Sequence, residues 1–335
     1  MSINMLDIAK KLNISLMTVS RALNNKGYIK KETRKKILET AGELGYIPNA
    51  LAKGLALNKT FNIGLVITDI SNPFYSKITK VIQEEALKKG YHLTLFNTNE
   101  NVEAEKEALY TIMEQRCDGA LLTSASKDFN LVCDLKKKGL PIVLLNRRAN
   151  RDDLDFVVCD NKKGAFLATD YLLQLGHKNI AHITGSTFIS SVKEKIEGYE
   201  AAFNKKGLKI NPRLIYETDI SLMGSYRATL EMLKDNLNIT AIFTYTDWMA
   251  VGVIKALNEK SIKIPDSISL IGYDNIEISP YLGVPLTTID MPINLMGKKA
   301  IEILLERINA NIETNIEFNK IYKPVLIERK SCKKL

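Results

Sequence analysis

Residues 7–44 read DIAKKLNISLMTVSRALNNKGYIKKETRKKILETAGEL, and apolar side chains recur in this stretch at the spacing of three short helices. The break Asn13-Ile14-Ser15 separates the first helix from the second, and Ser15 is a natural N-cap for the second. Two short helices joined by three residues match the outline of a helix-turn-helix. The pattern therefore predicts a three-helix head, although its periodicity is equally typical of any small helical bundle.

The same spacing predicts the caps and the inward faces of the three helices. On the first helix we expect Asn4 as the N-cap and Asp7 at the third helical position. On the second helix we expect an apolar face of Leu16, Val19 and Leu23. The third helix should run from about 32 to 44, and Gly45 should end it. Its expected inward side chains are Ile37, Leu38, Ala41 and Leu44.

The positive charge of the chain is concentrated in this head. Residues 1–60 hold eleven Lys and Arg against four Asp and Glu, which is a net +7 of the chain's +9. A basic head on a nearly neutral body indicates a polyanion-binding module joined to a body with another task. A basic surface without a partner is the alternative that charge alone leaves open.

The rest of the composition excludes several classes of protein. The chain has 335 residues, which predicts two or three domains. It has no apolar run of the length that a membrane span needs and no secretory signal, so we expect a cytoplasmic protein without a membrane partner. Its four cysteines form no C-x-x-C pair and its three histidines lack ligand spacing, so we expect no metal and no cofactor. The glycine and serine signatures of phosphate-loop, dinucleotide-binding and hydrolase sites are missing, so we expect no enzyme.

Beyond residue 60, short apolar runs alternate with amphipathic helices. This β-α-β rhythm predicts parallel sheets covered by helices on both faces, divided into two doubly wound halves. The expected strands are 63–68, 92–96, 119–123, 141–145, 156–159, 180–184, 241–245 and 269–272. The clearest expected helices are 75–89, 162–175, 196–206 and 248–259.

The candidate ligand site follows from where these strands end, because ligands of open parallel sheets lie at the carboxyl ends of strands. The residues found there are Asp69 to Tyr75, Asn146-Arg147, Thr246-Asp247 and Asp274. Carboxylates, amides, a guanidinium and aromatic rings together suit a polyhydroxyl ring. Each has a structural alternative: the aspartates could be caps or turn residues, the aromatic rings core, and Arg147 a solvated charge.

The string from Asp7 to Ala56 closely resembles the DNA-binding head of the lactose-repressor (LacI/GalR) family. The matching pieces are D-[IV]-A-K, T-V-S-R-x-L-N, E-T-R, E-L-G-Y-x-P-N and A-x-x-L, strung at the family's spacing. Four later strings, IGLVITDISNPFY, LGHKNIAHITG, AIFTYTDWMAVG and SLIGYDN, resemble the same family's effector core. The resemblance covers nearly the whole chain.

That resemblance implies an α/β fold with a helix-turn-helix head at 1–48, a hinge helix and linker at 49–60, and a core at 61–335. The core would be of the periplasmic-binding-protein type I kind, with two doubly wound parallel lobes. Lobe 1 would span about 61–160 and 291–320, and lobe 2 about 161–290 and 321–335, with crossings near Asp160, Asp290 and Lys320. Without a leucine heptad at the C-terminus, the expected assembly is a homodimer on a palindromic operator.

The resemblance also implies roles for individual residues. Leu16, Met17 and Arg21 would read bases, with apolar contacts to thymine methyl groups from the first two. Phosphate, groove or backbone contacts would come from Thr18, Ser20, Asn24 and Thr33, and Asn49 and Leu55 would act in the hinge, Leu55 as a minor-groove wedge. The implied effector contacts are Asn72, Phe74, Tyr75, Asn146, Arg147, Lys195, Thr246 and Asp274.

Several positions depart from the family's pattern, including Leu16 and Met17, which are apolar where some members carry polar readers. Lys195 stands where the family has an arginine, Thr246 where sugar binders have an asparagine, and Lys30 where a serine usually caps the third helix. The departures at Lys195 and Thr246 leave the identity of the effector open. Its expected class remains a small polar metabolite, in particular a saccharide. The rival interpretations are a solute-binding protein, disfavoured by the head, and a dinucleotide-dependent α/β enzyme, disfavoured by the missing glycine fingerprint.

Overall fold

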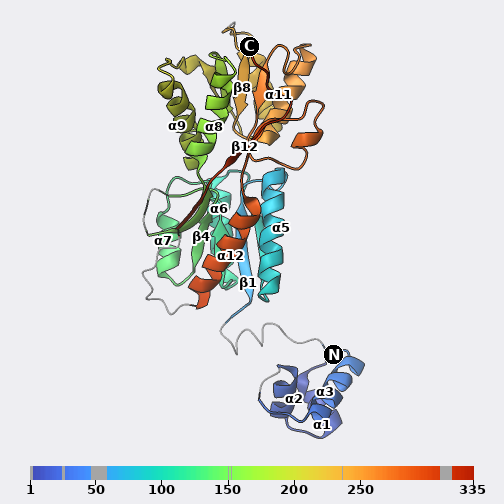
Figure 1. Cartoon of the computed structure of the whole chain (residues 1–335). Helices are drawn as coiled ribbons and strands as arrows, with labels where there is room; N and C mark the ends of the chain where they lie inside the picture. The colour runs from blue at the N-terminus through green and yellow to red at the C-terminus, as the bar shows by residue number, and fades with distance from the viewer. Residues whose placement is uncertain are drawn as a thin grey trace. The chain divides into compact units, whose positions relative to one another are not determined.

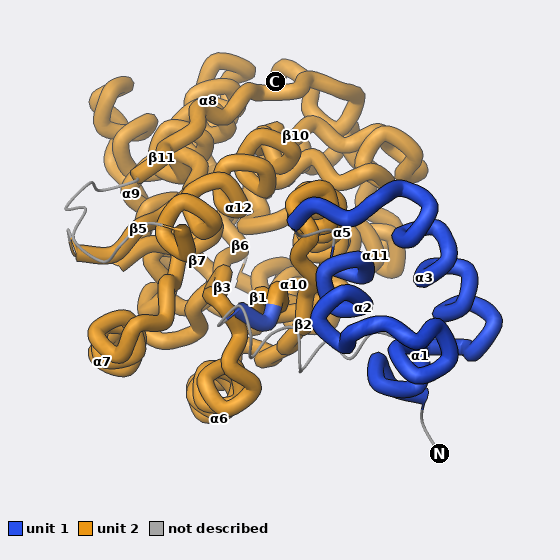
Figure 2. Tube along the Cα trace, turned by 90° about the horizontal axis from the view of Figure 1, so that it is seen from below, with its two compact units in different colours: residues 1–60 blue, residues 61–335 orange. Residues whose placement is uncertain are grey.

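The computed structural model describes residues 3–24, 27–46, 59–149, 151, 153–235, 237–309 and 319–335. The chain forms two compact units, residues 1–60 and 61–335 (Figure 2). Asn49, Leu55 and the expected hinge, apart from residues 59 and 60, lie outside the described residues.

The head contains three helices, α1 (Met5–Leu12), α2 (Leu16–Leu23) and α3 (Lys31–Glu43). The expected caps are confirmed. The Asn4 side chain accepts the amide of Leu6 at 2.8 Å, while Asp7 accepts the amide of Asn4 at 2.9 Å, and Ser15 accepts the amide of Thr18 at 3.1 Å. Gly45 ends α3 in the left-handed region, with a φ of 65°. Local sequence signals therefore set the start of α1, the start of α2 and the end of α3.

The core of the head differs from expectation at two leucines. Leu38 is 51% exposed and Leu16 is 46% exposed, so their expected inward placement is wrong. On α3 the buried stripe is Ile37, Thr40 and Ala41, and at 100° per residue Leu38 lies beside that stripe rather than within it. Leu16 is the first residue of α2, ahead of the turn that packs on the other two helices.

Lobe 1 of the second unit is built on a parallel six-stranded sheet in the order β11-β5-β4-β3-β1-β2. Its strands are β1 (Asn62–Ile67), β2 (His92–Asn97), β3 (Gly119–Leu122), β4 (Ile142–Leu145), β5 (Asp155–Cys159) and β11 (Asn319–Tyr322). Its helices are α5 (Pro73–Lys88), α6 (Val102–Glu114), α7 (Asn130–Lys137) and α12 (Ile293–Asn309). Figure 1 labels β1 and β4 of this sheet and the helices α5 and α12. Helices α5 and α12 share one hydrophobic core with alternate side chains of β1, and α6 and α7 share another. The sheet is thus covered on both faces.

Lobe 2 repeats this design on a smaller scale. Its parallel sheet has the order β7-β6-β8-β9. The strands are β6 (Ile180–Thr184), β7 (Ile215–Glu217), β8 (Ala241–Thr244) and β9 (Ser269–Ile271), with short turns η1 (Pro212–Leu214) and η2 (Ser279–Tyr281). The helices are α8 (Asn161–Gln174), α9 (Ser190–Lys205), α10 (Leu222–Met232) and α11 (Asp247–Glu259). Gly198 allows α8 and α9 to approach closely, since a Cβ there would lie 2.1 Å from the carbonyl oxygen of Lys162.

The two lobes are joined by three chain crossings. The first is at Asp160, whose amide donates to the carbonyl of Tyr322 at 2.8 Å. The second follows β10 (Thr288–Asp290), and the third lies between β11 and β12 (Val325–Ile327), which pairs antiparallel with β10. Lys320 still pairs with Val157 in the lobe 1 sheet, so the chain leaves that lobe at 323–324. The alternation of strands and helices is confirmed, but the short strands β7, β10, β11 and β12 were not among those expected.

Within the described ranges, no helix combines the length and the apolar character that crossing a membrane requires. No group of His, Cys, Asp and Glu side chains there is arranged to hold a metal ion.

Candidate nucleic-acid interface and ligand cleft

Helix α2 presents large apolar side chains to solvent on a basic unit. Met17 is 62% exposed, and Leu16 beside it is also exposed. Arg21, one turn further along, is exposed as well, and its side chain passes 3.6 Å from the position of a Cβ on Gly27. The head's own core is formed by Ile8, Val19, Ala22, Ile37 and other residues of its inner faces. The three expected base readers therefore lie together on a surface that the head leaves uncovered.

The expected phosphate contacts are partly engaged within the head. The Thr18 hydroxyl bonds with that of Ser15 at 2.8 Å, and the Asn24 amide donates to the carbonyl of Ser20 at 3.0 Å. Thr33 is half-buried in the first turn of α3. The N-cap position of that helix holds Lys30, whose side chain makes no capping bond. The first turn of α3 therefore lacks the oxygen acceptor that a serine cap supplies.

All eight expected effector residues line one cavity between the lobes of the second unit. They are Asn72, Phe74, Tyr75, Asn146, Arg147, Lys195, Thr246 and Asp274. Lobe 1 contributes the end of β1 with α5 and the end of β4, while lobe 2 contributes α9 and the ends of β8 and β9. The carboxyl ends of parallel strands from two sheets thus face a shared space.

The lobe 1 wall combines caps with aromatic rings. Asn72 is the N-cap of α5 and accepts the amide of Phe74 at 3.0 Å. Phe74 and Tyr75 are buried and pack edge to face, with ring centroids 5.0 Å apart. Asn146 has a φ of 63°, and its amide donates to the Tyr75 hydroxyl at 3.4 Å. The rings belong to the core and also line the cavity, so the two interpretations of these residues are not exclusive.

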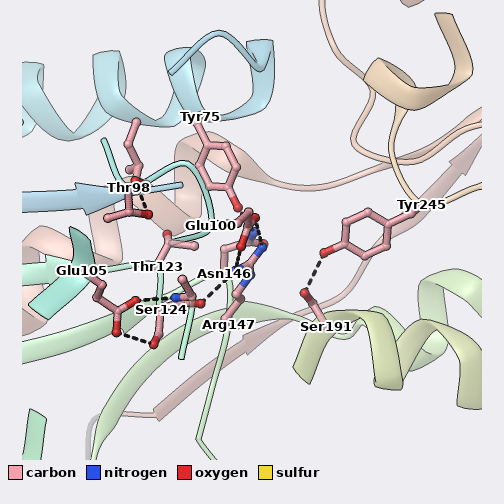
Figure 3. A network of polar contacts seen from close by, with 12 residues as sticks. Tyr75, Thr98, Glu100, Glu105, Thr123, Ser124, Asn146, Arg147, Ser191 and Tyr245 are labelled. Atoms are coloured by element: carbon pink, nitrogen blue, oxygen red, sulfur yellow. Dashed lines mark hydrogen bonds and ion pairs between the residues drawn. The ribbon is translucent and has the colours of Figure 1, made fainter. Parts of the chain in front are cut away.

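Arg147 is a buried cation rather than a solvated one; both its terminal nitrogens are engaged, while its buried Nε has no hydrogen-bond partner. Its side chain is 3% exposed and lies 2.6 Å from Glu100 (Figure 3). A second bond to the same carboxylate at 2.7 Å makes the pair bidentate, and the carbonyl of Ser124 accepts a third bond at 2.8 Å. Glu100 follows β2 in the left-handed region, with a φ of 59°.

The lobe 2 wall contains a buried lysine and a buried aspartate. The Lys195 ammonium donates to the carbonyl of Tyr245 at 2.8 Å and lies 3.4 Å from the centroid of the Tyr273 ring. Burial lowers the pKa of Lys195 to about 8. Burial raises the pKa of Asp274 well above its usual range, against an opposing effect of Lys195. Asp274 also has a φ of 107°, a strained backbone of the kind that collects at functional sites.

The other two positions at this end of lobe 2 have structural tasks. Thr246 is the N-cap of α11 and accepts the amide of Met249 at 3.1 Å. Asp247 is fully buried and accepts from the amide of Ile276 at 3.0 Å and the hydroxyl of Ser279 at 2.6 Å. Its pKa is raised to about 6 by burial. Asp247 therefore fixes the turn that carries Asp274, which is the structural alternative considered for it.

Sequence reasoning missed several residues that line the cavity: Thr68, Glu100, Asn161, Ser191, Ile220 and Tyr245. Tyr245 directly follows β8 and could have been found by the same strand-end rule. Glu100 lies three residues beyond β2, and Asn161 and Ser191 lie in the first turns of α8 and α9. Those three also follow the carboxyl ends of strands, β2, β5 and β6, so the strand-end rule applied to every strand could have found them too.

The cleft is nearly filled by its own side chains. Its cavity measures about 30 Å³, which is room for about one water molecule. The lobes also touch at the rim, where Arg148 of lobe 1 lies 2.8 Å from Glu194 on α9. A ligand the size of a sugar therefore requires the lobes to separate or these side chains to move.

Comparison with known proteins matches both units. Residues 4–49 match the family described as bacterial regulatory proteins, lacI family. Residues 60–327 match the periplasmic binding proteins and sugar binding domain of the LacI family. The HTH-type transcriptional repressor PurR of Aliivibrio salmonicida is 34% identical over 98% of this chain and 98% of its own.

Two solved structures are similar along their whole length. The lac repressor dimer bound to operator and the anti-inducer ONPF is 25% identical, with a TM-score of 0.88, over 99% of each chain. A LacI family transcriptional regulator from Enterococcus faecium with bound ribose is 30% identical, with a TM-score of 0.73, over 82% of this chain and 99% of that one. The protein therefore belongs to the LacI family, as a DNA-binding transcriptional repressor with an effector-binding domain and not an enzyme.

Proposed function

We propose that this repressor binds a palindromic operator as a homodimer in the bacterial cytoplasm. A two-fold dimer presents two recognition helices at a fixed separation, and a palindrome presents two matching half-sites. The similar lac repressor structure, described as a dimer bound to operator, supports this assembly.

The observation that carries the proposal is the exposed surface of α2. Leu16 and Met17 are large apolar side chains that remain in water on a unit with a net charge of +7, and Arg21 stands beside them. Apolar side chains suit thymine methyl groups in the major groove, and an arginine suits guanine with two bonds. Thr18, Ser20, Asn24 and Thr33 would then contact phosphates or the groove wall, and Asn49 and Leu55 would act in the hinge.

The effector would be a small polar metabolite, a sugar or a sugar derivative, held in the cleft between the lobes. The strongest support is the mixture of carboxylates, amides and aromatic rings that lines the cleft, with Asp274, Asn72 and Asn146 as hydroxyl partners. The similar regulator with bound ribose supports a saccharide. Lys195 and Thr246 would set this chain's preference apart from that of relatives with arginine and asparagine there.

The effector would act by linkage. A ligand that binds one arrangement of the lobes more tightly shifts the population toward it, and the paired hinges of the dimer transmit that shift to the heads. Contacts between the lobes, such as the Arg148–Glu194 ion pair, would differ between the two arrangements.

Selection of bound fragments from random-sequence DNA, followed by gel shifts, tests the proposal. We expect the selected sites to be two-fold symmetric and the complex to have the mass of two chains per site. Titration of a panel of sugars against that complex should then find one that changes the affinity. Asymmetric sites bound by a single chain would contradict the homodimer, and a response to no saccharide at all would contradict the class of effector.

A further inference from the structure

The positive charge of Arg147, which lines the cleft, is balanced by the carboxylate of Glu100. Both oxygens of Glu100 accept from the two terminal nitrogens of Arg147, at 2.6 and 2.7 Å. This fork-to-fork geometry is the arrangement in which a guanidinium binds carboxylates and phosphates most strongly. Glu100 therefore occupies the position on Arg147 that an anionic group of a ligand would take.

A second layer of bonds holds Arg147 in this position. Its guanidinium also donates to the carbonyl of Ser124 at 2.8 Å, and the Ser124 hydroxyl donates to Glu105 at 2.9 Å (Figure 3). The amide of Ala125 donates to the same buried carboxylate. Because Glu105 fixes the loop and the loop fixes Arg147, the guanidinium cannot turn toward a ligand without losing several bonds.

The other charges of the cleft do not offer an anion a better partner. Lys195 is the second cation among the described lining residues, and its ammonium is engaged by the carbonyl of Tyr245 and by two tyrosine rings. Asp69 adds a second carboxylate to the lining, and Asp274 adds a carboxyl group whose pKa is raised by burial. An entering phosphate or carboxylate would therefore meet the carboxylates of Glu100 and Asp69. Of the two cations, Lys195 has its ammonium engaged and Arg147 has both terminal nitrogens engaged.

We propose that Glu100 is a specificity-determining residue that makes the cleft select an uncharged polar ligand over phosphorylated or carboxylated ones. The inference rests on the proposed function, since it takes the cleft as the effector site. A neutral ligand leaves the Glu100–Arg147 pair intact and can donate to the cleft's carboxylates. An anionic ligand must displace Glu100, which leaves that carboxylate without its partner and close to a like charge.

Inorganic phosphate is a probe that does not depend on knowing the effector. Its affinity for the full chain is measured by isothermal titration calorimetry at pH 7 for the wild type and for Glu100→Gln, which removes the charge but keeps the shape. We expect phosphate affinity to rise about tenfold or more in Glu100→Gln, the scale of a freed charge-assisted site. Glu103→Gln is the matched control, because Glu103 is an exposed carboxylate three residues away that pairs with Lys106 instead.

Phosphate bound by the basic head is separated from phosphate bound in the cleft by a double variant. When Glu100→Gln is combined with Arg147→Gln, the increase in phosphate affinity should disappear. A gain that survives in the double variant, or one that Glu103→Gln reproduces, would refute the assignment. The assignment would also be refuted if the wild type bound phosphate and Arg147→Gln alone abolished that binding. Glu100 would then not be excluding anions.

If Glu100→Gln does not fold, Glu100→Ala is the second variant, in which water can reach the guanidinium, and the same gain is expected. The absence of a gain in a folded variant overturns the proposal. Operator binding is measured separately by gel shift, so a failure of the proposed regulatory function would appear there and not in the phosphate titrations.

Discussion

Replacing one lysine in each head should change the salt dependence of operator binding by a predictable amount. The chosen change is Lys35→Ala, because the Lys35 side chain is 77% exposed on α3 and its nearest carboxylate, Glu39, is 3.8 Å away. The described head exposes seven cations in all: Lys10, Lys11, Arg21, Lys30, Lys31, Lys35 and Lys36. Lys11 is committed to Glu43 at 2.9 Å.

The magnitude follows from the number of phosphates that the heads neutralise. With about four phosphates for each head, a dimer neutralises about eight, and the log–log slope of affinity against salt is about −7. Lys35→Ala removes one such contact from each head, so its slope should be about −5. Between 50 and 200 mM salt, affinity should then fall about 10⁴-fold for the wild type and about 10³-fold for the variant.

Fluorescence anisotropy with a labelled operator, repeated at several KCl concentrations, measures both slopes. Lys209→Ala removes the same charge from an exposed position on lobe 2 and should leave the slope unchanged. Lys35→Ala should also weaken selected and random DNA alike, since phosphates carry no sequence information. A wild-type slope shallower than about −3 would refute the account of the head, and an unchanged slope in Lys35→Ala would place that lysine away from the phosphates.

Three further predictions address the base readers, the cleft and the core. Arg21→Ala should cost about 1–3 kcal/mol on the selected operator and relax its base preference; an equal loss on random DNA, measured by competition gel shift, would remove Arg21 from base reading. Asp274→Ala should abolish the effector response and leave effector-free operator binding intact, because ligand hydroxyls lose a buried partner; a normal dose–response would place the pocket elsewhere. His182, stacked on Phe243 at 4.5 Å, has its pKa lowered to about 4 by burial. It therefore contributes stability that is present above pH 6.5 and lost as pH falls toward 4, about 2 kcal/mol between pH 7 and 5. Urea unfolding at pH 7 and pH 5 should show that loss as a difference between the wild type and His182→Asn, because the raised pKa of Asp247 changes the stability of both proteins in the opposite direction.

The helices of the head and most of the body's strands were predictable because their signals are local. Asn4, Ser15 and Gly45 mark helix ends through bonds and dihedral angles within a few residues of themselves. The strand-end rule likewise placed Asn146 and Asp274 at one cleft, since parallel strands in a doubly wound sheet all end on the same side. These features depend on residue types and on their spacing, which can be read directly from the sequence.

Other features depend on which surfaces meet across the fold. The exposure of Leu16 and Leu38 was mispredicted because helical spacing gives the direction of an apolar stripe but not how much of it three short helices can cover. The strands β10 and β12 contain three residues each and acquire their pairing only when distant parts of the chain come together. The task of Asp247 depends on Ser279 and Ile276, which are 32 and 29 residues away.

The chemical class of the site could likewise be predicted from local sequence, whereas its selectivity depends on contacts between distant parts of the chain. The order of strand ends along the chain was enough to indicate a polar ligand site containing Arg147, because each of those side chains follows its own strand. Whether Arg147 is available to a ligand depends on Glu100, 47 residues earlier, and on Glu105 beneath the loop that carries Ser124. An ion pair is decided by a separation of a few ångströms between groups on different elements, and that separation exists only once the strands have packed in their final order.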